Sequence, residues 1–189
     1  MASGNTGGPA REFSATLRDV TYGSGCTVVH PSNLYECTLG DDVFVGPFTE
    51  VQSNVSIGSR TRIQSHVFLC SLVTVGEDSF LGHGVKCIND RFSDFKIAFT
   101  DEAHKWEPTT IGSNVLIGTN ATILPVTICD NVVIGAGSVV TRDITEPGYY
   151  MGVPAVKCAD PPSKEDIAIA LSQETQNAPS PVAENPQAE

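Results

Sequence analysis

A six-residue repeat runs through the middle of the chain and constrains its fold more than any other feature. From Leu39 to Lys86 the sequence divides into eight consecutive hexads, and every hexad begins with an aliphatic residue. These first residues are Leu39, Val45, Val51, Ile57, Ile63, Leu69, Val75 and Leu81. The same frame returns at residues 111–122 and again at 128–139. A unit of this size cannot bury its own apolar residue, so neighbouring units must stack.

The period of six favours strands over helices. An α-helix repeats every 3.6 residues, so a hexad does not return a side chain to the same helical face. The aliphatic residues that open the hexads suit short strands, and the glycines that often follow them allow tight corners. Three strand-and-corner units would close a triangular coil, with the next coil about 4.8 Å above it. The alternative, a sandwich of unrelated short strands, does not explain eight hexads in one frame.

This pattern resembles the left-handed parallel β-helix of the hexapeptide-repeat acyltransferases, over about Val20 to Lys157. The resemblance implies an all-β triangular prism. The left-handed coil follows from the resemblance and not from the spacing. It further implies a homotrimer in which coenzyme A (CoA) lies in a groove between two prisms.

The breaks in the repeat predict the organisation of the chain. We expect a flexible segment at 1–12, a β-helix domain at 13–158, and a short helix with a disordered tail at 159–189. Residues 89–110 contain no hexads, so they should project as a loop, and long loops on rigid scaffolds often carry function. Ser163 is placed to cap the helix, and Pro147–Gly148 together with Gly152 to Pro154 should turn the chain away from the prism.

Composition narrows the possible partners. A net charge of −11 argues against nucleic acid and anionic membrane surfaces. No apolar run approaches a membrane span, and the N-terminus lacks the apolar core of a signal peptide, so we expect a cytoplasmic protein. The six cysteines form no CxxC pair, which favours reduced, mostly buried thiols over a disulfide or zinc framework.

A catalytic metal is not expected. Prism-shaped carbonic anhydrases hold zinc with three histidines from neighbouring subunits, and His30 and His66 have a similar separation here. The third histidine expected shortly after His66 is missing, and a catalytic zinc site needs three protein ligands.

The C-terminal hexads resemble the CoA-binding end of the acyltransferases. The resemblance implies that Thr119 and Ala136 offer backbone groups to the pantetheine arm, and that Arg142 and Lys157 meet the phosphates. An acidic protein needs such local cations to hold a polyanion. The alternative for both cations is an ordinary solvated surface charge.

The segment LGHGVKCINDRF, residues 81–92, resembles acetyltransferases that modify UDP- or dTDP-linked 3-amino sugars. Ser93 stands where these enzymes have proline, and Asn89-Asp90 where other hexapeptide acyltransferases carry a basic histidine. We expect Asn89 and Asp90 to position the sugar amine. His83 is the candidate side-chain base, although the CoA thiolate could take the proton instead.

Four further residues are candidates for substrate binding. His66 would line the sugar site of a neighbouring chain, and Arg91 would pair with a pyrophosphate or sugar carboxylate. His104 and Trp106 lie in the loop and would cover a ligand. The alternative for His66 is an ordinary surface histidine, and the alternative for Arg91 is an ordinary ion pair. For His104 and Trp106 the alternative is packing within the loop.

The predicted activity is transfer of acetyl from acetyl-CoA to the amine of a nucleotide-linked amino sugar. Two alternatives stay open: O-acetylation of a sugar or antibiotic hydroxyl, and a non-catalytic trimeric scaffold. O-acetylation would require a competent base, whereas a scaffold would not bind CoA.

Overall fold

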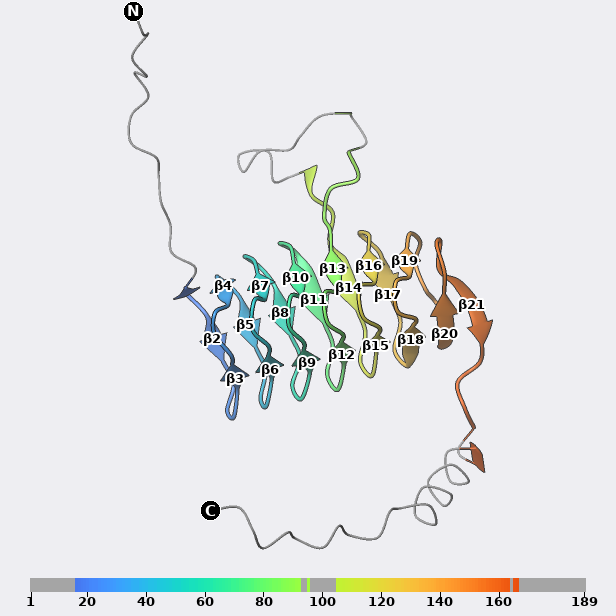
Figure 1. Ribbon diagram of the computed structural model, residues 1–189, viewed down its shortest axis with the longest axis horizontal. Coiled ribbons are helices and arrows are strands. Elements are labelled where there is room, and N and C mark those ends of the chain that lie inside the picture. The colour runs from blue at the N-terminus through green and yellow to red at the C-terminus, as the bar shows by residue number, and fades with distance from the viewer. Residues whose placement is uncertain (1–15, 93–94, 96–104, 164, 167–189) are drawn as a thin grey trace, which may run out of the picture.

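The chain winds into a triangular prism whose three sides are parallel sheets (Figure 1). The computed structural model describes residues 16–92, 95, 105–163 and 165–166. Successive strands join successive sheets, which we name A, B and C. Sheet A contains β1 (Leu17–Arg18), β4 (Asn33–Tyr35), β7 (Glu50–Val51), β10 (Phe68–Leu69), β13 (Lys86–Cys87), β16 (Thr122–Ile123) and β19 (Val139–Val140). Sheet B contains β2 (Thr21–Tyr22), β5 (Thr38–Leu39), β8 (Ser56–Ile57), β11 (Val73–Val75), β14 (Thr109–Ile111) and β17 (Thr127–Ile128). Sheet C contains β3 (Thr27–Val28), β6 (Phe44–Val45), β9 (Arg62–Ile63), β12 (Phe80–Leu81), β15 (Leu116–Ile117), β18 (Val132–Ile134), β20 (Gly148–Met151) and β21 (Val156–Ala159).

The first residue of each hexad fills the interior of the prism. Leu69 pairs in parallel register with Val51 below it and Cys87 above it, and all three are fully buried. Burying one such aliphatic side chain stabilises the fold by about 1.5–3 kcal/mol. The predicted all-β prism, with these residues inside, is confirmed.

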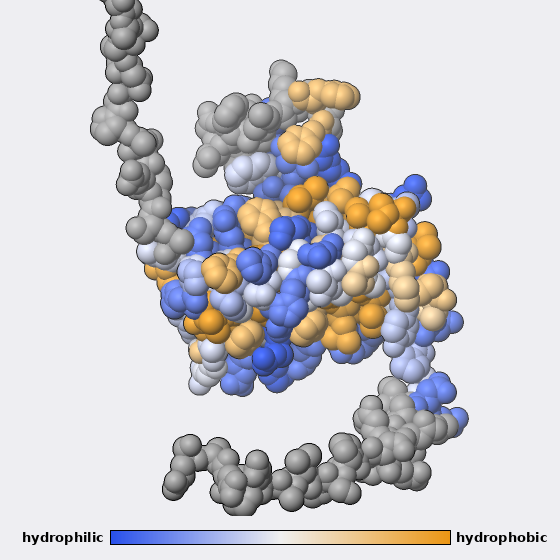
Figure 2. Space-filling view, in the orientation of Figure 1, coloured by the Kyte–Doolittle hydropathy of each residue, from blue (hydrophilic) through white to orange (hydrophobic). Residues whose placement is uncertain are grey.

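The outer surface is mixed in character. Figure 2 shows polar and apolar side chains intermixed over the visible face of the prism. Strand residues alternate in direction, so the residue before each buried one points outward. These outward positions are therefore free of the packing constraint and can differ from one sheet to another.

The corners require unusual backbone conformations. His66 and Asn120 have φ angles of 62° and 58°, in the left-handed region. Gly76 shows why glycine recurs after the first residue of a hexad. A Cβ atom there would lie 2.5 Å from the carbonyl carbon of Gly112 in the next coil.

We name the three edges of the prism after the sheets that they join. The CA edge contains residues 46–48, 64–66, 82–84, 118–120 and 135–137. The AB edge contains residues 52–54, 70–72, 124–126 and 141–143, and it also carries the predicted loop between β13 and β14. The two arms of this loop rise from the AB edge in Figure 1 and are joined where the Glu107 amide donates to the Asn89 carbonyl at 2.8 Å.

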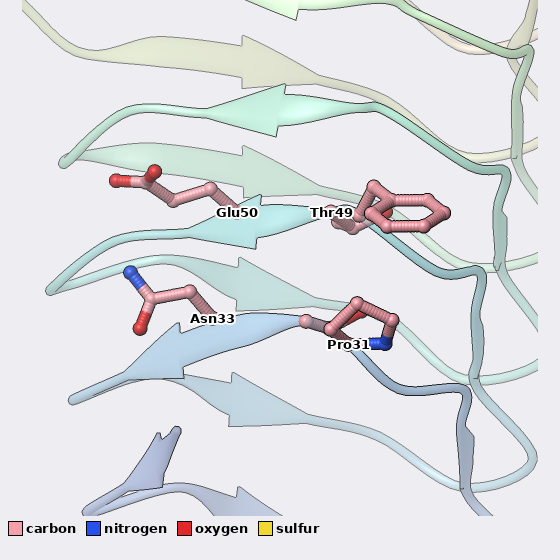
Figure 3. Close-up of a pocket in the computed structure, with 6 residues that line it drawn as sticks. Pro31, Asn33, Thr49 and Glu50 are labelled. Atoms are coloured by element: carbon pink, nitrogen blue, oxygen red, sulfur yellow. The ribbon is translucent and has the colours of Figure 1, made fainter. Parts of the chain in front are cut away.

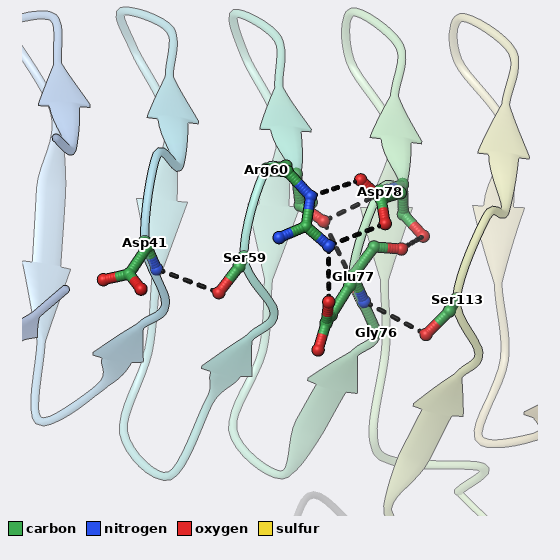
Figure 4. Close-up of polar contacts among 9 residues, drawn as sticks. Asp41, Ser59, Arg60, Gly76, Glu77, Asp78 and Ser113 are labelled. Carbon is green, nitrogen blue, oxygen red and sulfur yellow. Dashed lines mark hydrogen bonds and ion pairs between the residues drawn. The ribbon is translucent and has the colours of Figure 1, made fainter. Parts of the chain in front are cut away.

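The BC edge carries an exposed ion cluster (Figure 4). Arg60 donates from Nε to Asp78 at 2.7 Å and from Nη2 to Glu77 at 2.5 Å. The Arg60 guanidinium lowers the pKa of the Asp78 carboxyl. The cluster joins neighbouring coils, because Arg60 pairs with two carboxylates of the next coil at once.

The C-terminal coil differs from the prediction. Pro147–Gly148 does not turn the chain away, because β20 continues sheet C in parallel register with β18. The chain then returns as β21, antiparallel to β20, and covers the edge of the sheet. Ser163 and Asp166 form a reciprocal cap, with the Asp166 amide 3.1 Å from Ser163 Oγ. Residues 167–189 lie outside the described residues, so the rest of the predicted helix stays a prediction.

Candidate functional site

Three of the predicted residues form one column on the CA edge. The Asn120 amide donates to the His83 carbonyl at 2.8 Å, and the Gly137 amide donates to the Thr119 carbonyl at 2.8 Å. His83, Thr119 and Ala136 therefore occupy equivalent corner positions in three successive coils, and all three are exposed. This edge brings the candidate base together with two of the candidate CoA-binding residues.

His83 is held by a hydroxyl from the coil below. Its Nδ1 atom lies 2.8 Å from Ser65 Oγ. If Nδ1 carries the proton and donates to Ser65, then Nε2 is unprotonated and able to accept a proton. Sequence reasoning missed Ser65, although its corner position one coil before His83 gave the signal.

His66 lies lower on the same edge, against an aromatic ring. The rings of His66 and Phe48 stack with centroids 4.9 Å apart at an interplanar angle of 14°. Both side chains are exposed, so the stacked pair lies on the protein surface beside the outward face of sheet A.

The AB edge carries a pocket of about 330 Å³ at the root of the loop. It combines aromatic and amide side chains with one carboxylate. Its lining residues are Gln52, Phe68, Cys70, Ile88, Asn89, Asp90, Phe92 and Trp106. We call it the loop pocket. Its mixed lining is typical of a site for a small polar ring compound.

Asn89 and Asp90 are held in place by local hydrogen bonds. Asn89 Nδ2 donates to the Ser71 carbonyl at 3.2 Å, which leaves the amide oxygen as an acceptor. Asp90 Oδ1 accepts from the Phe92 amide at 2.7 Å. Both side chains are half-buried, and both line the loop pocket together with Trp106.

Arg91 secures the loop in this structure. Its Nε donates to Glu107 Oε2 at 3.2 Å, and its Nη2 donates to the Pro125 carbonyl. The guanidinium thus joins both arms of the loop to the next coil. His104 lies outside the described residues.

A second hollow of about 260 Å³ lies on the outward surface of sheet A, towards the N-terminal end (Figure 3). Pro31 and Phe48 line one side, and Asn33 and Glu50 the other. We call it the lower hollow. Sequence reasoning did not identify it, because its residues come from two coils and share no motif.

The two candidate cations differ. Arg142 is exposed at the C-terminal end of the AB edge. Lys157 Nζ lies 2.8 Å from Asp160 and 3.1 Å from Glu146, and hydrogen bonds to these carboxylates raise the pKa of the lysine. Lys157 is therefore already paired, whereas Arg142 is open to an anion.

Neither a metal nor a disulfide is evident in the part of the chain that the structure describes. No three His, Cys, Asp or Glu side chains gather there as a metal site requires. The six cysteines are unpaired, and burial raises the pKa of the Cys70 thiol to about 12. Among the same residues no helix is long and apolar enough to cross a membrane.

The candidate residues thus fall on two edges. His83 precedes β13 and Asn89 follows it, so they flank the outward surface of sheet A from opposite sides. A single chain does not bring the candidate base next to the amide that would position the amine.

Known proteins share the repeat and the fold. Residues 36–71 match the family described as bacterial transferase hexapeptide (six repeats), and residues 108–142 match the hexapeptide repeat of succinyl-transferase. The bifunctional protein GlmU of Wolbachia pipientis is 30% identical over 130 residues, which are 65% of this chain and 30% of the relative. The galactoside O-acetyltransferase of Escherichia coli K12 is 33% identical over 123 residues, 62% of this chain and 60% of the relative. The chain thus spans about 30% of the length of the first of these relatives.

A solved structure has the same architecture. The perosamine N-acetyltransferase of Caulobacter crescentus, crystallised as a point mutant with CoA and GDP-perosamine, superposes with a TM-score of 0.55 at 21% identity. The match covers 75% of this chain and 58% of that one. The chain thus contains two segments that match hexapeptide-repeat transferase models, and it has the fold of a left-handed parallel β-helix.

Proposed function

We propose that the protein transfers an acetyl group from acetyl-CoA to the amine of a nucleotide-linked amino sugar. The observation that carries the proposal is the loop pocket, where Asn89 and Asp90 converge beside aromatic side chains. The amide oxygen and the carboxylate can both accept hydrogen bonds from an amine and aim its lone pair. The solved relative that binds CoA and GDP-perosamine supports this class of substrates.

The CA edge would hold the acyl donor. Thr119 and Ala136 are exposed in the two coils that follow His83 on this edge, in line with a pantetheine arm lying along the edge. Arg142 is the better candidate for the phosphates, because Lys157 is already paired with two carboxylates.

A second copy of the chain is part of the proposal. Because His83 and Asn89 flank opposite sides of sheet A, the CA edge of one copy must lie against the AB edge of another to unite them. A homotrimer of parallel prisms supplies this arrangement three times over, with each site shared between two copies.

The chemistry then needs no cofactor beyond CoA. The neutral amine attacks the thioester carbonyl, and a tetrahedral intermediate forms. The C–S bond breaks as the amide forms, and the nitrogen loses its proton to the leaving thiolate or to His83 Nε2. Asn89 and Asp90 contribute by orientation.

Two measurements test the proposal. CoA release is followed with a panel of UDP-, dTDP- and GDP-linked amino sugars, and the expected product is heavier by one acetyl group. No release above blank with any acceptor would refute the activity. If the protein is instead a scaffold without activity, its Tm should also not rise when CoA is added.

O-acetylation is the second candidate, because the contact between Ser65 and His83 can leave Nε2 as a base. A hydroxyl acceptor depends on such a base more strongly than an amine does. His83→Ala should therefore nearly abolish O-acetylation, but reduce N-acetylation only modestly.

A further inference from the structure

The loop pocket and the lower hollow are linked by one hydrogen bond between their lining residues. Gln52 lines the loop pocket, Glu50 lines the lower hollow, and Gln52 Nε2 donates to Glu50 Oε1 at 2.9 Å. An acceptor held at Asn89 by its amine would reach the lower hollow by extending past Gln52 and Glu50.

We propose that the lower hollow is the nucleobase subsite of the acceptor, which rests on the proposed function. The hollow offers an apolar side, Pro31 and Phe48, to the flat surface of a ring. Phe48 is fixed by its stack on His66, so its position is set before a ligand binds. Stacking on an aromatic side chain contributes about 1–3 kcal/mol per base.

The opposite side supplies hydrogen bonds for the edge of a base. Glu50 and Asn33 project together in Figure 3 and are both half-buried. Gln52 occupies one carboxylate oxygen of Glu50, so the other can accept an N–H from a ligand. The Asn33 amide can donate to a neighbouring carbonyl. Guanine, uracil and thymine present a ring N–H beside a carbonyl oxygen, whereas adenine and cytosine do not.

A cation that could meet the diphosphate lies on the outward surface of sheet A, on strand β13, which leads to Asn89. Parallel register orders Asn33, Glu50, Phe68 and Lys86 on four successive strands of sheet A. At the usual strand spacing, Asn33 and Lys86 are about 14 Å apart, comparable with an extended nucleoside diphosphate. Lys86 Nζ donates to the carbonyls of His66 and Gly84, at 2.8 and 3.3 Å, which leaves its third proton for a phosphate.

Calorimetric titration of the full-length protein, saturated with CoA, tests the subsite. The probes are GDP, UDP, dTDP, ADP, CDP and inorganic pyrophosphate. GDP and the uracil-type diphosphates should bind at least several-fold more tightly than ADP, CDP and pyrophosphate. Nucleoside diphosphates that bind no better than pyrophosphate, or a preference for ADP or CDP, would overturn the assignment.

Four variants, one of them a control, separate the contacts. Glu50→Gln should weaken GDP and UDP by roughly tenfold, since a hydrogen bond to a charged group is lost, and leave pyrophosphate unchanged. Lys86→Met should weaken all probes alike. Glu77→Gln, on the BC edge, is the matched control and should change nothing. If Trp106→Leu rather than Glu50→Gln removes the preference, the base lies at the loop end and the proposal fails.

Different results would refute the proposed subsite and the proposed acetyl transfer. Base-selective binding that depends on Glu50, without CoA release from any amino sugar, would keep the subsite and refute the transfer. CoA release that is equally fast with a free amino sugar, and unaffected by Glu50→Gln, would keep the transfer and refute the subsite.

Discussion

Sheets A and B have the same interior and very different exteriors. The outward residues of sheet B all carry a hydroxyl and are all exposed: Thr21, Thr38, Ser56, Thr74, Thr110 and Thr127. Those of sheet A differ from strand to strand and are mostly half-buried: Asn33, Glu50, Phe68, Lys86, Thr122 and Val139. Above the first coil, the inward residues of both sheets are fully buried and almost all aliphatic, such as Leu69 and Ile57, whereas Leu17 and Tyr22 of the first coil are exposed.

The difference separates the positions that the packing of the prism determines from the positions that are free to vary. The inward residues must fill a prism of constant width, so they hardly vary. Sheet B outward positions need only suit a strand in water, and β-branched threonine satisfies that requirement. Sheet A instead gathers an aromatic ring, an amide, a carboxylate and an ammonium, which no packing requirement explains.

The largest effect should come from breaking the shared interior. Leu69→Ala removes a fully buried side chain and should lower the free energy of unfolding by about 2–5 kcal/mol. Thr74→Ala, on the outward surface of sheet B, should change it by no more than about 0.5 kcal/mol. Urea titration measures both, and equal losses would contradict the division into inward and outward positions.

The next largest effect should distinguish the outward surfaces of sheets A and B by their contribution to activity. Asn89→Ala removes an amine acceptor and should lower kcat/KM by about 10- to 100-fold, the equivalent of one hydrogen bond to a charged group. Thr110→Ala, its control on sheet B, should retain the wild-type rate. An Asn89 variant with wild-type turnover would remove this residue from the site.

The fold was predictable because six-residue spacing is a global constraint. One misplaced aliphatic residue would face water, so the frame at Leu39–Leu81 determined which side chains lie inside. The handedness was not derivable from the spacing. The end of the prism was mispredicted at Gly148, because a proline–glycine corner inside the coil looks the same in sequence as an exit.

The candidate site was predictable only in part. Asn89, Asp90 and Trp106 came from one motif and one loop, and the loop pocket unites them. Ser65, Phe48 and Glu50 were missed, because stacking brings them together from different coils. Assigning each residue its corner or outward position in the hexad would have found them.

A smaller effect concerns the root of the loop. Arg91→Met removes the contacts to Glu107 and to the Pro125 carbonyl, so the loop pocket should loosen. The KM for the amino sugar should rise less than tenfold, while the KM for acetyl-CoA stays constant. Arg60→Met loses a comparable exposed ion pair on the BC edge and serves as the control. An unchanged KM in Arg91→Met would mean that the ion pair between Arg91 and Glu107 does not hold the loop pocket in shape.

The smallest effect on activity should come from alkylation. Burial raises the pKa of Cys70 to about 12, so its reactive thiolate is scarce at pH 8 and increases only as the pH approaches 12. Exposed Cys158 should react first with iodoacetamide at pH 8, and activity should persist. Peptide mass mapping identifies the adduct. Early modification of Cys70 would show that the floor of the loop pocket opens.

The most direct test of the account is a crystal structure with CoA and an accepted nucleotide-linked amino sugar bound. The account predicts the sugar amine within about 3.2 Å of the Asn89 or Asp90 side chain, on the outward surface of sheet A. It predicts CoA along the CA edge of a neighbouring copy. Electron density for the sugar against the threonines of sheet B, or far from Asn89, would contradict it.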